Sequence, residues 1–218
     1  MKTEQPSSGW PAIHGGIFLA VLGGVWLYLP SLDWPWYWLL PLAAYGVLVL
    51  AVPPLRWTAP RLAIGRLTGA PLVGAIALGI VTSGVLLAFD ALVRPDVPVL
   101  ATGVAANFGQ LILVGIGFSL ANALLEELIF RGLLYEALAA EWGVAVAVAV
   151  SAVLFGLAHV YGYPPGQLGA VFATGYAVAL GLLRWWTGGL GLVVACHVGA
   201  DATIFAILAS AGAFGAAA

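Results

Sequence analysis

The chain has very little charge: Asp, Glu, Lys and Arg make up only 7% of its 218 residues, whereas 63% are hydrophobic. A soluble globule of this size needs far more polar surface than these residues can supply. The composition therefore excludes a soluble protein and indicates an integral membrane protein.

Runs of lysine and arginine are also missing, and the formal net charge is −2. Nucleic-acid binding normally requires a basic patch, so we expect no nucleic-acid partner. The only cysteine, Cys196, cannot form an internal disulfide. As a free cysteine it is expected to pack as a small apolar residue.

Apolar runs of about 17 to 25 residues suit helices that cross a bilayer, and the ten-residue alternation typical of membrane β-barrels is missing. We therefore predict an all-α, polytopic membrane helical bundle with about seven transmembrane helices in a single domain. The predicted spans cover residues 13–29, 36–52, 72–92, 108–130, 144–160, 167–185 and 190–209. No small-residue cleavage site follows the first run, so we expect a span there rather than a signal peptide.

The distribution of positive charge predicts the orientation, because cytoplasmic loops carry the excess of Lys and Arg. The predicted spans assign one side of the membrane to the ends and connections that contain Lys2, Arg56, Arg61, Arg66, Arg131 and Arg184. Only Arg94 falls on the other side. The N-terminus is therefore predicted inside, and an odd number of spans places the C-terminus outside.

Ionisable side chains within apolar segments are costly, so they are the first candidates for function. Glu126 and Glu127 follow an apolar run, and Arg131 comes four residues after Glu127, where a helix brings a carboxylate and a cation together. If Glu127 and Arg131 neutralise each other, Glu126 has no cationic partner and is a candidate general base. The alternative is a charge cluster at the inner mouth of the helix that only marks where lipid ends.

His159 is the second candidate, because Glu127 lies sixteen residues before Gly143 and His159 sixteen residues after it. A hairpin that turns near 141–143 places both about 24 Å from the turn, at 1.5 Å per helical residue. The spacing predicts that Glu126 or Glu127 faces His159, and that Phe155, one turn earlier, walls the site from lipid. The alternative is a helix-end histidine at an interface.

His197 and Asp201 lie four residues apart in the last span and share one helical face. The carboxylate can orient the imidazole or join it in binding a metal, and the alternative is a structural hydrogen-bonded pair. His197 is only about 12 Å past the turn at 188–189, which makes it shallower than His159. His159 and His197 lie at the same depth in the membrane only if the hairpin turn near 141–143 projects further than the turn at 188–189. The spacing leaves this open.

Three ordered motifs carry a resemblance: EELIFRG at 126–132, FGLAH at 155–159 and HVGAD at 197–201. In order, spacing and apolar surroundings they resemble the motifs of the CAAX prenyl endopeptidase-like intramembrane metalloproteases, also called the CPBP or Abi family. The resemblance covers about residues 108–205 and implies a protease-like core (108–209), whereas the three N-terminal spans (1–107) of the single membrane domain carry none of it. It also implies a multi-pass endopeptidase of the cell (plasma) membrane, with membrane lipid and a peptide or a lipidated, prenylated protein as partners.

The resemblance implies roles for individual residues as well. These are water activation by Glu126 with His159, binding or stabilisation of the scissile carbonyl by His197 with Asp201, and support by Glu127, Arg131 and Phe155. In a metal-dependent version, Glu126, His159, His197 and Asp201 bind Zn²⁺ and leave a position open for water. In a metal-free version, Glu126 is the general base. The third motif of the family often ends in Asn, and an ionised Asp201 cannot donate a hydrogen bond to an oxyanion, so ligation or orientation of the histidine suits it better.

The motifs of other intramembrane proteases are missing from the sequence. It contains no Gly-x-Ser-Gly and no His-Glu-x-x-His, and Asp201 does not stand in a Gly-x-Gly-Asp context. Two other classes of function remain as alternatives, a non-catalytic membrane immunity or scaffold protein and a proton or metal-ion carrier. The absence of an internal sequence repeat disfavours the carrier.

Overall fold

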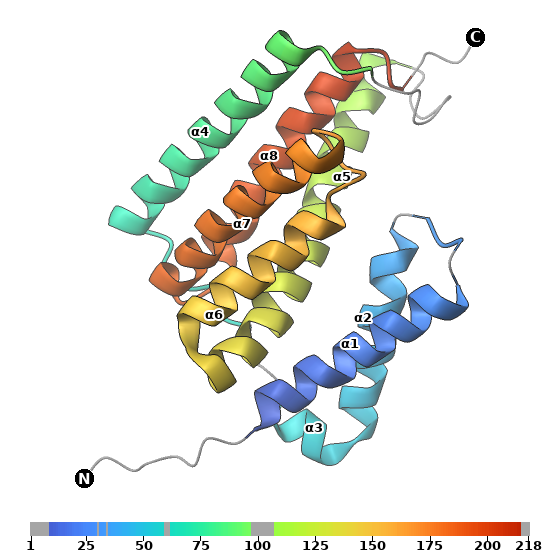
Figure 1. The fold of residues 1–218 in the computed structure, drawn as a ribbon, viewed down its shortest axis with the longest axis vertical. Coiled ribbons are helices and arrows are strands. Elements are labelled where there is room, and N and C mark those ends of the chain that lie inside the picture. Colours follow the sequence, from blue (N-terminus) through green and yellow to red (C-terminus); the bar gives the residue numbers. More distant parts are fainter. Residues whose placement is uncertain (1–8, 30, 34, 59–61, 97–106, 215–218) are drawn as a thin grey trace.

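The computed structural model describes residues 9–29, 31–33, 35–58, 62–96 and 107–214. Within these ranges every regular element is a helix, and no strand occurs. The helices are α1 (Trp10–Tyr28), α2 (Trp36–Ala51), α3 (Pro53–Thr58), α4 (Ala70–Val93), α5 (Phe108–Glu127), the π-helix η1 (Leu128–Leu134), α6 (Tyr135–Ala158), α7 (Gly166–Thr187) and α8 (Gly191–Ser210). The predicted all-α fold is confirmed (Figure 1).

In the described part of the chain, five helical segments are long and apolar enough to cross a membrane, judged by length and composition. One of them, Phe108–Ala158, has 51 residues and contains α5, η1 and α6. It folds back at Gly143, whose φ of 80° is a conformation that glycine adopts far more readily than other residues. Dividing this segment at Gly143 and adding the shorter apolar helix α2 gives seven apolar helical segments, in agreement with the predicted number.

The reversal at Gly143 confirms the hairpin predicted near 141–143 (Figure 1). The predicted end of the fourth span at residue 130 is wrong, because the helix continues through η1 into the first part of α6. The side chains from Ile129 to Leu134 are buried, so this stretch belongs to the protein core and not to a surface loop. The hairpin consequently extends past the turn between α7 and α8, as the level of His159 requires (Figure 1).

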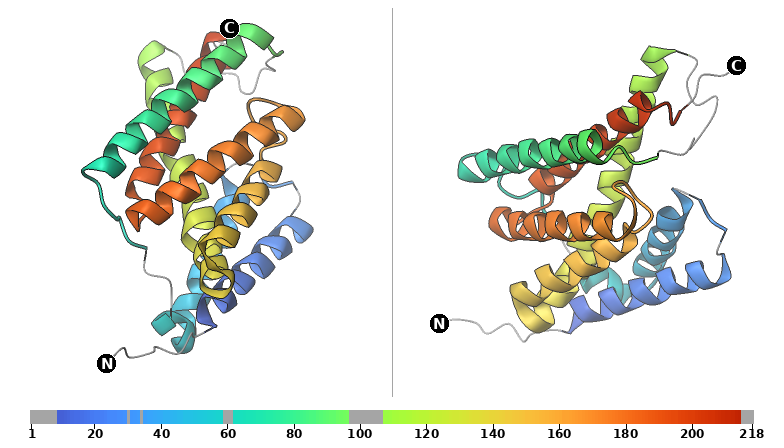
Figure 2. Two further views of the ribbon diagram at one scale, coloured as in Figure 1. Left: turned by 60° about the vertical axis from the view of Figure 1, so that its left-hand side comes forward. Right: turned by 45° about the horizontal axis from the view of Figure 1, so that its top comes forward.

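The helices form two groups (Figure 2). In one group α8 packs against α4, α5 and α7, while α7 also packs against α6. The other group contains α1, α2 and α3 and contacts the first mainly through α1, which lies against α6 and η1. His14 ties this group together, because its buried ring nitrogens lie 2.7 Å from the Tyr45 hydroxyl and 3.0 Å from Thr58 Oγ1.

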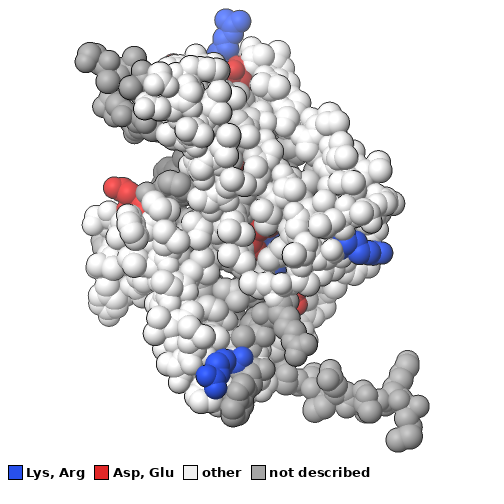
Figure 3. Space-filling view, turned by 180° about the vertical axis from the view of Figure 1, so that it is seen from behind, with Lys and Arg blue, Asp and Glu red and all other residues white. Residues whose placement is uncertain are grey.

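Charged side chains are sparse on the surface, and the face in Figure 3 shows only scattered ones among uncharged residues. Two of the arginines used to predict the orientation are inside the protein, since Arg131 is 0% exposed and Arg184 is 7% exposed. Arg184 forms an ion pair with Glu136. Counting these two arginines as loop charges is therefore wrong, and Lys2 and Arg61 lie outside the described residues. The inside location of the N-terminus stays a prediction.

Candidate active site

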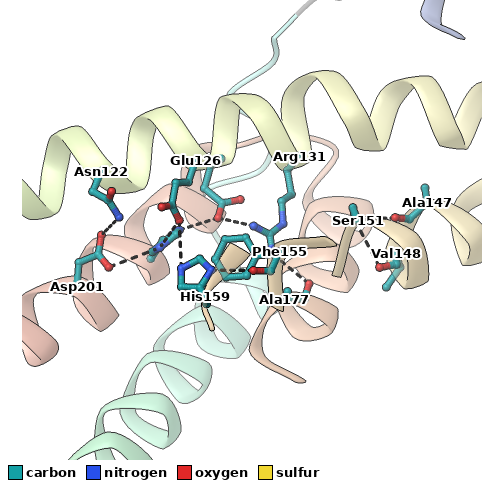
Figure 4. A network of polar contacts seen from close by, with 12 residues as sticks. Asn122, Glu126, Arg131, Ala147, Val148, Ser151, Phe155, His159, Ala177 and Asp201 are labelled. Carbon is teal, nitrogen blue, oxygen red and sulfur yellow. Dashed lines mark hydrogen bonds and ion pairs between the residues drawn. The ribbon is translucent and has the colours of Figure 1, made fainter. Parts of the chain in front are cut away.

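Polar residues from three helices meet at one place inside the bundle (Figure 4). Glu126 comes from α5, His159 follows the last residue of α6, and His197 and Asp201 come from α8. Glu126, His197 and Asp201 are only 5%, 3% and 6% exposed. This burial contradicts a charge cluster at the mouth of a helix. All four residues that the sequence singled out as catalytic candidates lie together.

Glu126 directs its Oε2 atom toward both imidazoles. This oxygen lies 3.5 Å from His159 Nε2 and 3.7 Å from His197 Nε2, longer than the roughly 3.2 Å limit of a direct N–H···O bond. Oε2 is buried and has no hydrogen-bond partner within the described ranges. A buried carboxylate oxygen without a partner is costly, so the atom is well placed to bind a further group.

The other nitrogen of each imidazole is engaged by a hydrogen-bond acceptor. His159 Nδ1 lies 2.7 Å from the Phe155 carbonyl oxygen, and His197 Nδ1 lies 2.7 Å from Glu127 Oε1. A carbonyl or carboxylate oxygen only accepts, so each Nδ1 carries the proton and donates it. In the neutral imidazoles, both Nε2 lone pairs therefore face the Glu126 carboxylate.

Glu127 and Arg131 form the predicted pair, with both side chains 0% exposed and 2.7 Å between Glu127 Oε1 and Arg131 Nη1. Arg131 also donates to the Ala177 carbonyl of α7 at 3.2 Å. Asp201 was one candidate for the residue that orients His197, and its Oδ1 atom is 3.6 Å from Nε2. The 2.7 Å contact with Glu127 fixes the imidazole instead. Glu127 thus connects the arginine to the histidine.

Asp201 has a close partner that the sequence analysis missed. The Asn122 side-chain amide donates to Asp201 Oδ2 at 3.2 Å. Asn122 comes one helical turn before Glu126, on the same face of α5. That spacing was a usable signal, because a polar residue four positions before a buried carboxylate reaches the same site.

Phe155 was predicted to wall the site from lipid, and this stays a prediction; its side chain is packed inside the bundle and only 1% exposed. Its ring stacks on the His159 imidazole at 4.1 Å and meets the His197 imidazole edge-on at 5.7 Å. The Arg131 guanidinium lies 4.6 Å from the centre of the ring. Phe155 is therefore an internal support that contacts both histidines.

Two cavities reach the site from different sides. The α2–α5 cavity, about 690 Å³, is lined by aromatic side chains such as Tyr37 and by Glu126, His159 and Asp201. The α4–α7 cavity, about 520 Å³, is lined almost entirely by apolar residues of α4 and α7 and also reaches His159, His197 and Asp201. A bound molecule can thus contact the same polar groups from either cavity.

Close contacts between helices lie beyond both ends of the α4–α7 cavity. At one end Phe89 of α4 packs edge-on against the rings of Tyr163 and Phe172, at 5.9 and 6.1 Å. At the other end the Trp186 side chain of α7 lies against Gly74 of α4, where an added Cβ atom would lie 2.7 Å from the indole ring. The cavity is therefore confined to the middle of these two helices.

The donor types of the site match those that zinc binds, namely imidazole nitrogens and carboxylate oxygens. Both histidines also donate their Nδ1–H to an acceptor, as metal-bound histidines usually do. Nevertheless, among the residues that the structure describes, no three His, Cys, Asp or Glu side chains converge closely enough to hold a metal ion. As placed, these side chains form no three-ligand metal site, and zinc binding stays a prediction.

Residues 108–203 match the family model of the type II CAAX prenyl endopeptidases, Rce1-like. Over this segment the chain is Rce1-like. The Rce1-like segment begins at α5 and ends within α8, so it includes all three motifs. The resemblance to CAAX prenyl endopeptidases is thus confirmed for these residues. No curated protein and no solved structure matches the chain.

The Rce1-like match and the apolar helices together identify an integral membrane protein. At the level of the family, the match supports a CAAX-type intramembrane protease. The helices α1 to α4 lie outside the matched segment, although α2 and α4 supply walls of the two cavities. The polar site is therefore Rce1-like, whereas part of the surface that a substrate would meet is not covered by the match.

Proposed function

We propose that the chain is an endopeptidase of the cell membrane that hydrolyses a peptide bond in a membrane-associated, prenylated protein. The observation that supports this most directly is Glu126 Oε2, buried without a hydrogen-bond partner and facing the Nε2 atoms of His159 and His197. A water molecule beside this oxygen has an acceptor for its proton. The α2–α5 cavity gives a peptide access to that water.

In the proposed reaction, Glu126 accepts a proton from the water while the water oxygen bonds to the carbonyl carbon of the peptide. The π electrons of the carbonyl move to its oxygen and form an oxyanion. His159 holds the water in line, because its Nδ1–H is bound to the Phe155 carbonyl and its Nε2 is left to accept. The proton on Glu126 then passes to the peptide nitrogen, the C–N bond breaks, and a carboxylic acid and an amine leave.

His197 is proposed to stabilise the oxyanion. Glu127 holds its Nδ1, so the opposite nitrogen always faces Glu126 and Asp201. When His197 is protonated, Nε2–H can donate to the oxyanion as charge develops on it. Asp201, with Oδ1 3.6 Å from Nε2, is assigned to stabilising the positive charge of the protonated imidazole, because an ionised carboxylate cannot itself donate to the oxyanion.

The α4–α7 cavity supports a substrate that carries a hydrocarbon chain. Its apolar lining suits a prenyl group, and its volume of about 520 Å³ is within the roughly 300–1,000 Å³ typical of small-molecule sites. Because the cavity reaches His159 and Asp201, a chain bound there holds the neighbouring peptide bond near Glu126. We therefore propose that prenylation strengthens binding.

Zinc binding by Glu126, His159, His197 and Asp201 is a second proposal for how water is activated. Its support is the donor set and the orientation of both imidazoles, with Nδ1–H bound elsewhere. Metal content of the purified protein is measured by mass spectrometry, and activity is compared before and after a chelator. Activity that survives complete removal of metal contradicts the zinc proposal.

The first prediction concerns the proposed general base. Glu126→Gln keeps the shape of the side chain but removes the proton acceptor, so we expect at least about a hundredfold loss of kcat, the low end of what general base catalysis contributes. His159→Ala should also lose activity. The assay is cleavage of a farnesylated peptide, with three residues after the modified cysteine, by purified protein in detergent.

Glu136→Gln is the control, since Glu136 pairs with Arg184 outside the site, and it should retain kcat. Full activity in both Glu126→Gln and His159→Ala, with the melting temperature unchanged, contradicts the catalytic assignment. A wild-type protein that cleaves neither prenylated nor plain peptides supports the non-catalytic alternative.

The second prediction concerns the hydrocarbon chain. Gly175 lines the α4–α7 cavity, and a Cβ atom added there meets nothing within 4 Å, so Gly175→Leu fills the cavity without a backbone clash. We expect KM for the farnesylated peptide to rise about tenfold, with little change for the same peptide without the prenyl group. Gly84→Leu on α4 is the control, because Gly84 is equally unobstructed and does not line the cavity. Equal KM values for Gly175→Leu and wild type contradict the assignment of the prenyl site.

A further inference from the structure

Asn122 occupies a central position in the site although it belongs to none of the three motifs. It lies on α5 one turn before Glu126 and is only 8% exposed. It lines the α2–α5 cavity together with Glu126, His159 and Asp201. Figure 4 shows its side chain reaching across from α5 to Asp201 on α8.

The Asn122 amide bonds to two carboxyl groups. Nδ2 donates to Asp201 Oδ2 at 3.2 Å, and the side chain is also hydrogen-bonded to Glu126. Without a donor between them, two carboxylates in a buried site repel each other. The amide therefore bridges the two groups and fixes their relative position.

We propose that Asn122 is a positioning residue for the proposed hydrolysis. By holding Oδ2 of Asp201, it keeps Oδ1 beside His197 Nε2, 3.6 Å away. By contacting the Glu126 carboxyl, it keeps Oε2 turned toward the two imidazoles. The inference rests on the proposed function, because positioning matters only if Glu126 and Asp201 act on a substrate.

The contact between α5 and α8 does not depend on this amide alone. Two turns before Asn122, a Cβ atom on Gly115 would lie 2.7 Å from the Phe205 ring of α8, so the helices are already in close contact there. Phe118 of α5 also meets Phe205, with 6.2 Å between the ring centres. Loss of the Asn122 side chain should therefore disturb the carboxyl groups much more than the packing of the two helices.

The test compares single and exchanged substitutions with the farnesylated peptide assay. Asn122→Ala should lower kcat by about 10- to 100-fold, the usual cost of losing a residue that orients an active group, with KM and melting temperature near wild type. Asn122→Asp should be worse, because it places a third carboxyl group against Glu126 and Asp201. Combining Asn122→Asp with Asp201→Asn restores one amide and one carboxylate, so kcat should recover at least tenfold relative to Asn122→Asp alone.

Asn107→Ala is the matched control, because Asn107 caps the start of α5 far along the chain from the site. It should keep the wild-type kcat. Wild-type kcat in Asn122→Ala, or no recovery in the exchanged double variant, overturns the inference. Glu126→Gln is measured in parallel. If Glu126→Gln is inactive while Asn122→Ala is fully active, only the role of Asn122 is contradicted. Full activity in both variants contradicts the proposed function as well.

Discussion

Arg131 is completely buried in an apolar bundle, yet it carries a permanent charge. Its partners are the Glu127 carboxylate at 2.7 Å, the Ala177 carbonyl at 3.2 Å and the face of the Phe155 ring. Burying two charges is costly, and the pair is stable only while both members are present. The same carboxylate holds His197, so the charge balance at Arg131 affects the geometry of the proposed active site.

We predict that Arg131→Met destabilises the protein by about 3–5 kcal/mol, the usual cost of leaving one member of a buried ion pair without its partner. The apparent melting temperature in detergent is the measurement. Arg56→Met replaces an exposed arginine by the same residue and should change the melting temperature little. If Arg131→Met melts with the wild type, the buried pair does not stabilise the fold. Adding Glu127→Gln to Arg131→Met should restore part of the lost stability, because it removes the buried carboxylate that has lost its partner.

At the scale of the residue, the cost of ionisable groups in lipid explains which predictions from sequence succeed. Glu126, His159 and His197 stand out because an ionisable side chain in an apolar membrane helix is costly and is therefore rare outside functional sites. The 2.7 Å contact between Glu127 and His197 was not predicted. It depends on how α5 and α8 are rotated about their axes, and residue spacing along each helix does not give that rotation.

α6 and α7 lie in close contact near the site. A Cβ atom on Gly156 would lie 2.6 Å from the Ala170 carbonyl oxygen and would also overlap Thr174 Oγ1. Glycine is therefore required at this position for α6 to lie against α7. Gly156 follows Phe155 and precedes His159 by three residues, so a shift of α6 here moves both rings.

We predict that Gly156→Ala destabilises the protein by about 1–3 kcal/mol, the usual cost of overpacking, and lowers cleavage of the farnesylated peptide. Gly117→Ala on α5 is the matched control. A Cβ atom there meets nothing within 4 Å, so the better helix propensity of alanine should leave stability equal or slightly higher. The measurement is the melting temperature of the two variants. If Gly156→Ala melts at the same temperature as Gly117→Ala, glycine is not required at position 156 for α6 to pack against α7.

At the scale of the element, long apolar runs predicted the helices, and Gly143 marked the hairpin correctly. The π-helix η1 was not predicted, because the apolar pattern ends near Phe130 while the helix continues through a buried arginine. A charged residue normally signals the end of a membrane span. Here Arg131 donates to Glu127 and to the Ala177 carbonyl, so the helix continues inside the protein.

At the scale of the whole molecule, composition alone was sufficient to predict an all-helical membrane protein. The arrangement of α1, α2 and α3 as a separate group was not predicted, and neither were the two cavities next to the site. Such features depend on contacts between distant parts of the chain, for example Trp38 of α2 against Phe130 of η1. A periodic pattern within one helix carries no information about these contacts.

The orientation of the whole molecule in the membrane can be predicted from its exposed arginines. Arg56, which follows α2, and Arg66, which precedes α4, are exposed, and so is Arg94 after the end of α4. Because α4 has 24 residues, it is about 36 Å long at 1.5 Å per residue, long enough to cross a bilayer. We therefore expect Arg66, before the helix, and Arg94, after it, on opposite sides of the membrane. The excess of exposed arginine at the end with Arg56 and Arg66 predicts that this end faces the cytoplasm.

Single cysteines test this prediction in intact cells with a maleimide that does not cross membranes. The background variant is Cys196→Ala, which removes the chain's only natural thiol, a buried one. Arg94→Cys should react from outside, whereas Arg56→Cys should react only after the cells are opened, because the N-terminal side of α4 is inside. The opposite labelling of the two cysteines places the N-terminus outside and shows that so few exposed arginines do not determine the orientation.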